Sequence, residues 1–177
     1  SGAGKSTLIK TILGLYQPTT GAVRINHKNL VAYNLNDYYQ HVFYLSQDAP
    51  IFQGTLKENI IFDKEIADEE IIAVLEKCQL GAFYQALKGG LSAEIGEKGA
   101  NLSGGEKQRI AFARLFFTNA EVIVLDEATS ALDETTEEKL FAAIKDQLKN
   151  QLVIMITHRP KNLLYANATV ELTKNQA

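Results

Sequence analysis

The sequence has a single cysteine, no long apolar run and no excess of basic charge. One cysteine among 177 residues cannot form an internal disulfide, which is compatible with a reducing compartment. No apolar run approaches the roughly 18 residues that span a bilayer, and no signal peptide is visible. The net charge of −3 argues against a protein that coats nucleic acid, because such proteins usually need a basic face.

The apolar content points to a folded domain. Apolar residues make up 46% of the chain, which predicts a packed core rather than disorder. The length allows one domain, or one core with an inserted lobe. Cys78 lies in helical step with Ile71, Val74 and Leu75, so we expect it to be a small buried apolar group.

Apolar periodicity predicts an α/β chain. Helical spacing begins near residue 6, and a short strand is expected around Val23 and Ile25. The stretch 41–47 reads as a buried strand that ends in the polar Gln47, and continuous apolar runs at 122–125 and 152–157 suit central parallel strands that are covered on both faces. Several helical signals separate the first run from the others. We therefore expect an α/β core that is interrupted by a mostly helical insertion from about residue 49 to about residue 99.

Polar side chains follow each of the predicted core strands. The first predicted strand ends in Gln47, the second is followed by Asp126, and the third is followed by His158. In open parallel sheets, ligands bind at the edge where the strands have their carboxyl ends. These three side chains are therefore expected to lie near one ligand.

The opening stretch "SGAGKST" has the composition of a phosphate-binding loop. Its glycines let backbone N–H groups face an anion, and the N-terminus of the following helix adds partial positive charge. Lys5 can supply a full charge to the terminal phosphates, and the Ser6 hydroxyl can bind Mg²⁺. Taken alone, the stretch also fits an ordinary glycine-rich start of a helix.

The stretch "VIVLDEATSALD" supplies two neighbouring acids. Asp126 at the strand end can hold the Mg²⁺ shell, and Glu127 can orient and deprotonate an attacking water. The alternative is simple polarity at the end of a strand. The glycine loop earlier in the chain favours phosphoryl transfer.

Together with "NLSGGEKQRIAFAR", these residues resemble the nucleotide-binding domain of ABC transporters. The resemblance covers nearly all of the chain, with the motifs in the family's order. The matching motifs are the Walker A loop at 1–7, the Q-loop at Gln47, the signature motif at 102–106, Walker B at 122–126, the catalytic Glu127, the D-loop at 130–133 and the switch histidine, His158.

The resemblance implies a set of site residues. These are Glu127, His158 and Gln47 as catalytic residues; Ser1, Gly2, Ala3, Gly4, Lys5, Ser6, Thr7, Ser103, Gly104, Gly105 and Asp133 as ATP-binding residues; and Ser6, Gln47 and Asp126 as Mg²⁺ ligands. In this family two such domains face head to tail, and the signature motif of one completes the ATP site of the other. Ser103, Gly104 and Gly105 repeat the chemistry of the opening loop, with bare backbone donors and a hydroxyl at a helix start.

The resemblance further implies a single ATP-binding cassette over residues 1–177 that is incomplete at its N-terminus. The fold class it implies is α/β: a P-loop NTPase (RecA-like) core with a mostly parallel sheet, an inserted helical subdomain and a small antiparallel β element. Its core is expected at about 1–48 and 112–177, and its helical subdomain at about 49–111. The stretches "YLSQDAPIFQGTLKENI" and "GEKG" look like those of exporters, where the helical subdomain, the Q-loop and the region of Glu97 meet a transmembrane domain. The expected location is the cytoplasmic face of a membrane, with membrane association only through that domain and no nucleic-acid partner.

Other members of the same superfamily remain as alternatives. An importer ATPase is the nearest, and the Q-loop and "GEKG" stretches distinguish the two. DNA-repair relatives carry a long coiled coil, whereas this insertion is short and lacks sustained heptads. Translation-associated relatives carry two cassettes on one chain. A scaffold without activity would predict a broken Lys5, Glu127 or His158, and all three are intact.

Overall fold

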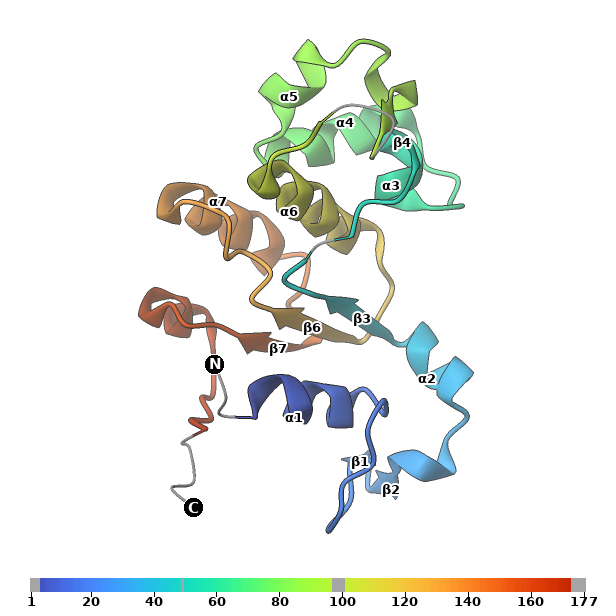
Figure 1. Ribbon diagram of the computed structural model, residues 1–177, viewed down its shortest axis with the longest axis vertical. Helices are drawn as coiled ribbons and strands as arrows, with labels where there is room; N and C mark the ends of the chain where they lie inside the picture. The colour runs from blue at the N-terminus through green and yellow to red at the C-terminus, as the bar shows by residue number, and fades with distance from the viewer. Residues whose placement is uncertain (1–3, 49, 97–100, 173–177) are drawn as a thin grey trace.

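The computed structural model describes residues 4–48, 50–96 and 101–172. Its central element is a sheet of three parallel strands in the order β3-β6-β7 (Figure 1). The strands are β3 (Val42–Leu45), β6 (Val122–Asp126) and β7 (Leu152–Ile156). Leu45 pairs with Leu125, and Asp126 pairs with Ile156, so the three strands end at the same edge.

The two faces of β6 explain why this strand is an uninterrupted apolar run. Val124 packs on one face against Ile9 and Leu13, from the helix α1 (Lys5–Ile12) and the residue that ends it. Ile123 and Leu125 belong to the larger core on the opposite face. The central strand β6 is therefore covered on both faces, as the sequence pattern predicts. The prediction is wrong for the start of β7, the edge strand, where Leu152 is 61% and Val153 40% exposed.

The opposite face is covered by α6 (Gly104–Ala113) and α7 (Glu134–Lys145) (Figure 1). Phe112 of α6 meets Phe141 of α7 edge to face, with 6.0 Å between ring centres. Ile110, Phe112 and Leu140 are fully buried. The packing of α6 on α7 therefore fixes both helices on this face of the sheet.

The segment between β3 and α6 is mainly helical. It contains α3 (Leu56–Ile61), α4 (Asp68–Lys77), α5 (Gly81–Ala86) and the antiparallel pair β4 (Gly54–Thr55) and β5 (Glu94–Ile95). Cys78 is 0% exposed beside Leu75, and burial raises the pKa of its thiol to about 12. The prediction of a buried cysteine is confirmed.

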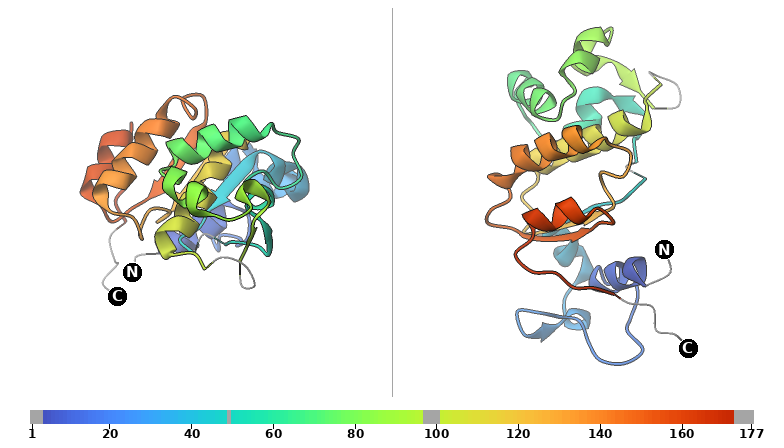
Figure 2. Two further views of the ribbon diagram at one scale, coloured as in Figure 1. Left: turned by 90° about the horizontal axis from the view of Figure 1, so that it is seen from above. Right: turned by 90° about the vertical axis from the view of Figure 1, so that its left-hand side faces the viewer.

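A second antiparallel pair, β1 (Arg24–Ile25) and β2 (Lys28–Asn29), forms a hairpin. Asn26 and His27 both have positive φ angles, 48° and 67°, which matches the two-residue turn that suits the twist of a hairpin. The chain then continues through η1 (Leu30–Ala32) and α2 (Leu35–Gln40) to β3. The hairpin and the helical segment lie at opposite ends of the molecule (Figure 2, right).

The fold class predicted from the sequence is confirmed: a mostly parallel core sheet, inserted helices and a small antiparallel element. The remaining short elements are η2 (Gly90–Ser92), η3 (Arg114–Phe117) and η4 (Pro160–Tyr165). α6 crosses the expected boundary at 111/112, and the division into core and helical subdomain stays a prediction.

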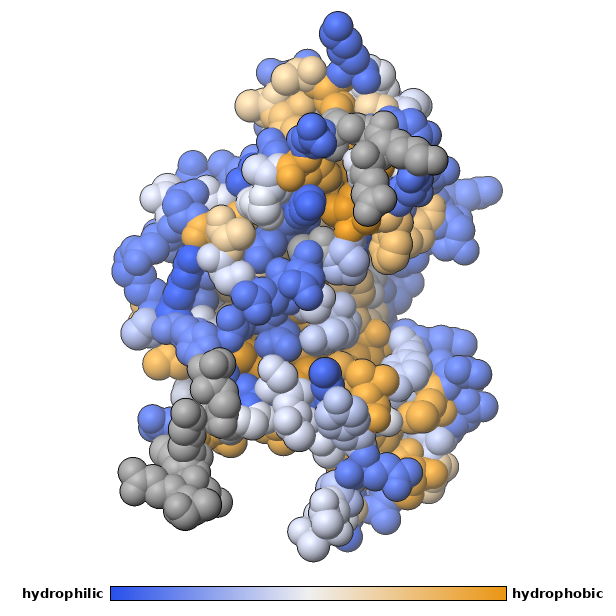
Figure 3. Space-filling view, viewed as in Figure 1, coloured by the Kyte–Doolittle hydropathy of each residue, from blue (hydrophilic) through white to orange (hydrophobic). Residues whose placement is uncertain are grey.

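On the face of Figure 1, hydrophilic side chains cover much of the middle of the molecule, and hydrophobic ones show through over the helical segment (Figure 3). Among the described helices, none has the length and apolarity needed to cross a membrane.

Candidate functional site

The N-terminus of α1 has the features of an anion site. Gly4 precedes the helix with φ +81°, a left-handed conformation that glycine adopts without strain. No acidic residue lies in the first turn, so the helix dipole is not neutralised there. Lys5, Ser6 and Thr7 form that turn, whereas the predicted binding residues Ser1, Gly2 and Ala3 lie outside the described residues.

Three of the predicted site residues meet at the carboxyl edge of the sheet. The Nζ atom of Lys5 lies 2.8 Å from Nε2 and 3.2 Å from Nδ1 of His158. Oε1 of Glu127 lies 2.8 Å from the same Nε2 atom. These residues come from α1, the end of β6 and the end of β7, so three distant parts of the sequence converge here.

The contacts of His158 favour one tautomer. Lysine only donates hydrogen bonds and a carboxylate only accepts them, so Nε2 cannot serve both neighbours in one protonation state. A hydrogen on Nε2 would satisfy Glu127, and the free Nδ1 lone pair would then accept from Lys5. With 56% of its side chain exposed, His158 is also accessible to a ligand at this edge.

Glu127 adopts an unusual backbone conformation. Its φ angle is +51°, in the left-handed region that residues other than glycine rarely occupy. Its N–H donates to the carbonyl of Ile156 at 3.1 Å, which extends the pairing of β6 with β7 by one residue. Strained backbone of this kind costs about 1–3 kcal/mol and concentrates at functional sites. Here it turns the carboxylate toward His158.

Asp126 is held by a residue that sequence reasoning missed. The hydroxyl of Tyr44, on the neighbouring strand β3, donates to Oδ2 of Asp126 at 3.1 Å. Burial, and after it the charge of Asp126, raise the pKa of Tyr44 to about 12, so the phenol keeps its proton. Because β3 is parallel to β6 in known register, alternation along the two strands is the signal that could have found this pair.

A second missed residue, Gln108 of α6, joins two loops of the site. This side chain is only 3% exposed, and its Nε2 donates to the backbone carbonyl of Gln47 at 3.1 Å and to Oγ of Ser130 at 3.0 Å. Its Oε1 accepts from the backbone N–H of Ala131 at 2.9 Å. Gln108 thereby fixes the backbone of Gln47, whose own side chain is exposed, against the D-loop, defined here as residues 130–133.

The loop after Gln47 is fastened by Arg114. Its Nε donates to the carbonyl of Asn59 and its Nη2 to the carbonyl of Pro50, both at 2.8 Å. Burial lowers the pKa of Arg114 to about 10, so the guanidinium is charged at neutral pH. This arginine ties the path of the chain after Gln47 to α3.

The predicted signature residues lie apart from Lys5. Ser103 caps α6: its Oγ accepts from the N–H of Glu106 at 3.2 Å, and Oε2 of Glu106 accepts from the N–H of Ser103 at 2.8 Å. A side chain at Gly104 would meet Ala131, and one at Gly105 would meet Leu132, so both glycines face the D-loop. In the described parts of the chain, no hydrogen bond joins Ser103 to Lys5, Glu127 or His158.

Asp133 serves as the cap of α7. Its Oδ1 accepts from the N–H of Thr136 at 2.9 Å and its Oδ2 from the Thr136 hydroxyl at 2.7 Å, and these bonds lower the pKa of the carboxyl. Asp133 also lines a hollow of about 300 Å³ together with His158 and Arg159. The predicted role of Asp133 in ATP binding stays a prediction.

The oxygen groups at the sheet edge suit Mg²⁺. Ser6, Asp126 and the Gln47 amide offer a hydroxyl, a carboxylate and a carbonyl oxygen, which are the hard ligands that this ion prefers. Among the described residues, no group of three or more His, Cys, Asp or Glu side chains could hold a metal by itself. The donor set therefore fits an ion that takes its remaining ligands from phosphate and water.

The features above define the class of P-loop nucleoside triphosphatases. They are a parallel sheet, a helix that begins after a glycine, and a lysine and two acids at the carboxyl edge of the sheet. The family model described as ABC transporter matches residues 1–130. This chain belongs to the ABC transporter family. Membership implies that it binds ATP.

Three relatives illustrate the similarity. A Rickettsia bellii protein, named as a candidate export ATP-binding/permease protein, is 38% identical over 98% of this chain and 30% of its own length. The mitochondrial iron-sulfur clusters transporter ATM1 of Saccharomyces cerevisiae is 37% identical over 97% of this chain and 25% of its own length. The solved structure of a bacterial Atm1-family ABC exporter with ATP bound superposes with a TM-score of 0.83, at 31% identity, over 92% of this chain and 29% of that one. The chain thus spans less than a third of the length of these relatives.

Proposed function

We propose that this chain is the ATP-hydrolysing cassette of an exporter. The observation that carries the proposal is the convergence of Lys5, Glu127 and His158 at one edge of the sheet, from three separate segments. Phosphoryl transfer to water needs a group that holds the phosphates and a group that positions the water. Lys5 and Glu127 are suited to these two tasks, and His158 lies within hydrogen-bond reach of both.

Each residue has a defined task in this proposal. Lys5 and the N-terminus of α1 bind and orient the terminal phosphates of ATP. Glu127 positions the attacking water and accepts its proton, while His158 contacts the γ-phosphate and holds Glu127 in place through Nε2. Asp126, with Gln47 and Ser6, would hold Mg²⁺, which neutralises charge on the phosphates when bound.

A second cassette is the proposed partner of the nucleotide site. Ser103, Gly104 and Gly105 lie at a helix start that faces the D-loop, and no described hydrogen bond connects Ser103 to the cluster around Lys5. One chain thus carries two separated sets of phosphate-binding groups. A head-to-tail pair of cassettes would join them into two complete sites, the closed arrangement that two-fold symmetry favours.

The proposed link to transport is a membrane domain. The relatives are named for export or for transport of iron-sulfur clusters, and this chain matches under a third of their length. We therefore propose contact with a transmembrane domain through the helical segment and the loop after Gln47, at the cytoplasmic face of a membrane. Glu97, predicted to belong to this contact, lies outside the described residues.

Substitution of Glu127 by glutamine tests the proposed reaction. In the complete transporter, meaning this cassette with the membrane domain it serves, we expect Glu127→Gln to lower the ATP turnover rate by about 10²–10³-fold. ATP binding should persist, because Lys5 and the helix start are unchanged. Turnover is measured by phosphate release in the presence of Mg²⁺, and binding by nucleotide retention.

The matched control is Glu121→Gln. Glu121 lies at the opposite end of β6, where it pairs with His41 at 3.2 Å and is 76% exposed. This variant should hydrolyse ATP at the wild-type rate. Turnover of the Glu127 variant within a factor of two of wild type would exclude Glu127 from the proposed role.

A further inference from the structure

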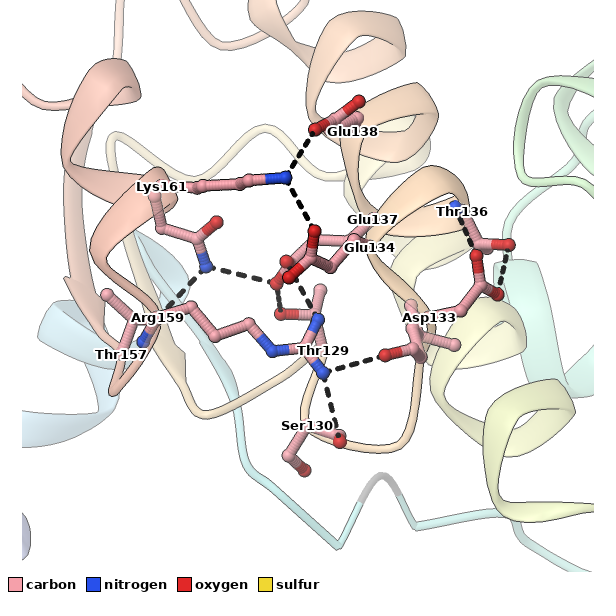
Figure 4. Close-up of polar contacts among 12 residues, drawn as sticks. Thr129, Ser130, Asp133, Glu134, Thr136, Glu137, Glu138, Thr157, Arg159 and Lys161 are labelled. Carbon is pink, nitrogen blue, oxygen red and sulfur yellow. Dashed lines mark hydrogen bonds and ion pairs between the residues drawn. The ribbon is translucent and has the colours of Figure 1, made fainter.

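A buried carboxylate, Glu137, lies in a network of polar contacts with residues from the loops after β6 and β7 (Figure 4). Glu137 belongs to the first turn of α7, and only 4% of its side chain is exposed. A charge in such a place is stable only when it is paired and fully hydrogen-bonded. Its partners therefore indicate what the residue holds together.

Both oxygens of Glu137 are engaged. Oε1 accepts from the hydroxyl of Thr129 and from Nδ2 of Asn162, the latter at 3.0 Å. Oε2 accepts from Nη1 of Arg159 at 2.8 Å. Thr129 follows Glu127 by two residues, and Asn162 lies in the η4 segment after His158. The Glu137 carboxylate therefore joins the segment after Glu127 and the segment after His158 to α7.

Arg159 extends the connection to the D-loop. Its second nitrogen, Nη2, donates to the carbonyl of Leu132 at 2.7 Å and approaches the carbonyl of Ser130 at 3.4 Å. The planar guanidinium can serve the carboxylate and the loop at once, because its donors point in fixed, different directions. A lysine has a single nitrogen and cannot span both.

His158 lies within this network. Oγ of Thr157, the residue before it, accepts from Nδ2 of Asn162 at 3.0 Å and from the N–H of Arg159 at 2.9 Å. Both neighbours of His158 are thus tied to α7. Arg159, the residue after His158, connects the backbone of this segment to the carbonyls of Ser130 and Leu132 through its Nη2 hydrogen bonds.

We propose that Glu137 and Arg159 are positioning residues that make the His158 segment and the D-loop move as one unit. This inference rests on the proposed ATPase function. When His158 contacts the γ-phosphate, Arg159 holds the D-loop, and with it Asp133, in the position that the second cassette requires. Loss of the γ-phosphate releases the histidine and the D-loop together.

Two substitutions separate this role from simple stabilisation of the buried carboxylate. Arg159→Lys keeps a cation for Glu137 but removes the bonds to Leu132 and Ser130. Glu137→Gln keeps an oxygen for Thr129 and Asn162 but places an amide nitrogen against the donor Nη1 of Arg159. Lys161→Gln is the control, since Lys161 also bridges to α7, at 2.5 Å to Glu134 and 3.6 Å to Glu138. Lys161 is exposed, and within the described residues it forms no hydrogen bond or ion pair with the D-loop.

The experiment measures kcat and KM for ATP and the melting temperature in the complete transporter. We expect Arg159→Lys to lower kcat by about 10- to 100-fold, because small misplacements of reacting groups have effects of this size. KM should stay within about twofold, since the phosphate-binding groups are unchanged. Glu137→Gln should lower kcat to the same extent, and Lys161→Gln should match wild type.

The decisive result is that of Arg159→Lys, the variant that leaves the buried carboxylate paired. A wild-type kcat for this variant would overturn the inference, whatever its melting temperature and whether or not Glu137→Gln folds. Failure of the proposed function gives a different outcome: wild type itself would then lack ATP turnover, or Glu127→Gln would leave it unchanged.

Discussion

At the scale of single residues, the site depends on side chains that hold one another at the edge of the sheet. Glu127 reaches His158 at 2.8 Å only because its backbone takes a left-handed turn directly after β6. Asp126, its neighbour, points instead toward Tyr44. The two adjacent acids are thereby separated, one toward the proposed water and one toward the proposed metal.

The contact between Tyr44 and Asp126 gives a prediction for metal binding. Tyr44→Phe keeps the ring but removes the hydrogen bond to Oδ2, which would leave the carboxylate less well oriented. A hydrogen bond to a charged group contributes about 1.5–3 kcal/mol when buried and less at a site as exposed as this one. We expect the Mg²⁺ concentration for half-maximal ATPase activity to rise a few-fold, as measured by titration of the ion at saturating ATP. An unchanged titration would show that Tyr44 does not orient Asp126.

At the scale of elements, α6 links the loops that surround the site. Gln108 on this helix contacts the backbone after β3 and the D-loop after β6, so the start of α6 cannot move independently of either. Ser103 and Glu106 cap the same helix at the turn that carries Gly104 and Gly105. The predicted signature residues are thus on a rigid helix start.

Substitution of Gln108 tests this connection. Gln108→Leu keeps similar volume but leaves the N–H of Ala131 and the carbonyl of Gln47 without this partner. These bonds are part-buried, and a hydrogen bond of this kind contributes about 0.5–1.5 kcal/mol, so the free energy of unfolding should fall by about 1–3 kcal/mol. Chemical denaturation measures the change. An unchanged free energy of unfolding would contradict the assignment of these bonds.

The elements show what sequence alone could and could not provide. Apolar runs predicted β3, β6 and β7, although β6 alone among them is covered on both faces along its length. The glycine loop and the strand-end acids identified Lys5 and Glu127 through their local chemistry. Gln108, Tyr44 and Glu137 could not be found this way, since their importance comes from partners that lie far away in the sequence and meet them only after folding.

At the scale of the whole molecule, the two sets of predicted phosphate-binding groups lie at different helix starts of one chain. The helix start at Lys5 joins the edge formed by β6 and β7, whereas the helix start at Ser103 packs on the D-loop. The central claim is that a second cassette brings its own Ser103 to the ATP held by Lys5.

A linked pair of cassettes in the complete transporter tests this claim most directly, with Lys5→Ala and Ser103→Arg placed either on the same cassette or on opposite ones. The readout is the amount of ATP retained per pair, measured in a Glu127→Gln background that slows turnover. If each site is shared, substitutions on opposite cassettes damage the same site, and about one ATP per pair remains. Both substitutions on one cassette then damage one site each, and no ATP remains. If each chain held a complete site by itself, the same-cassette pair would retain one ATP and the opposite-cassette pair none, which would contradict the account.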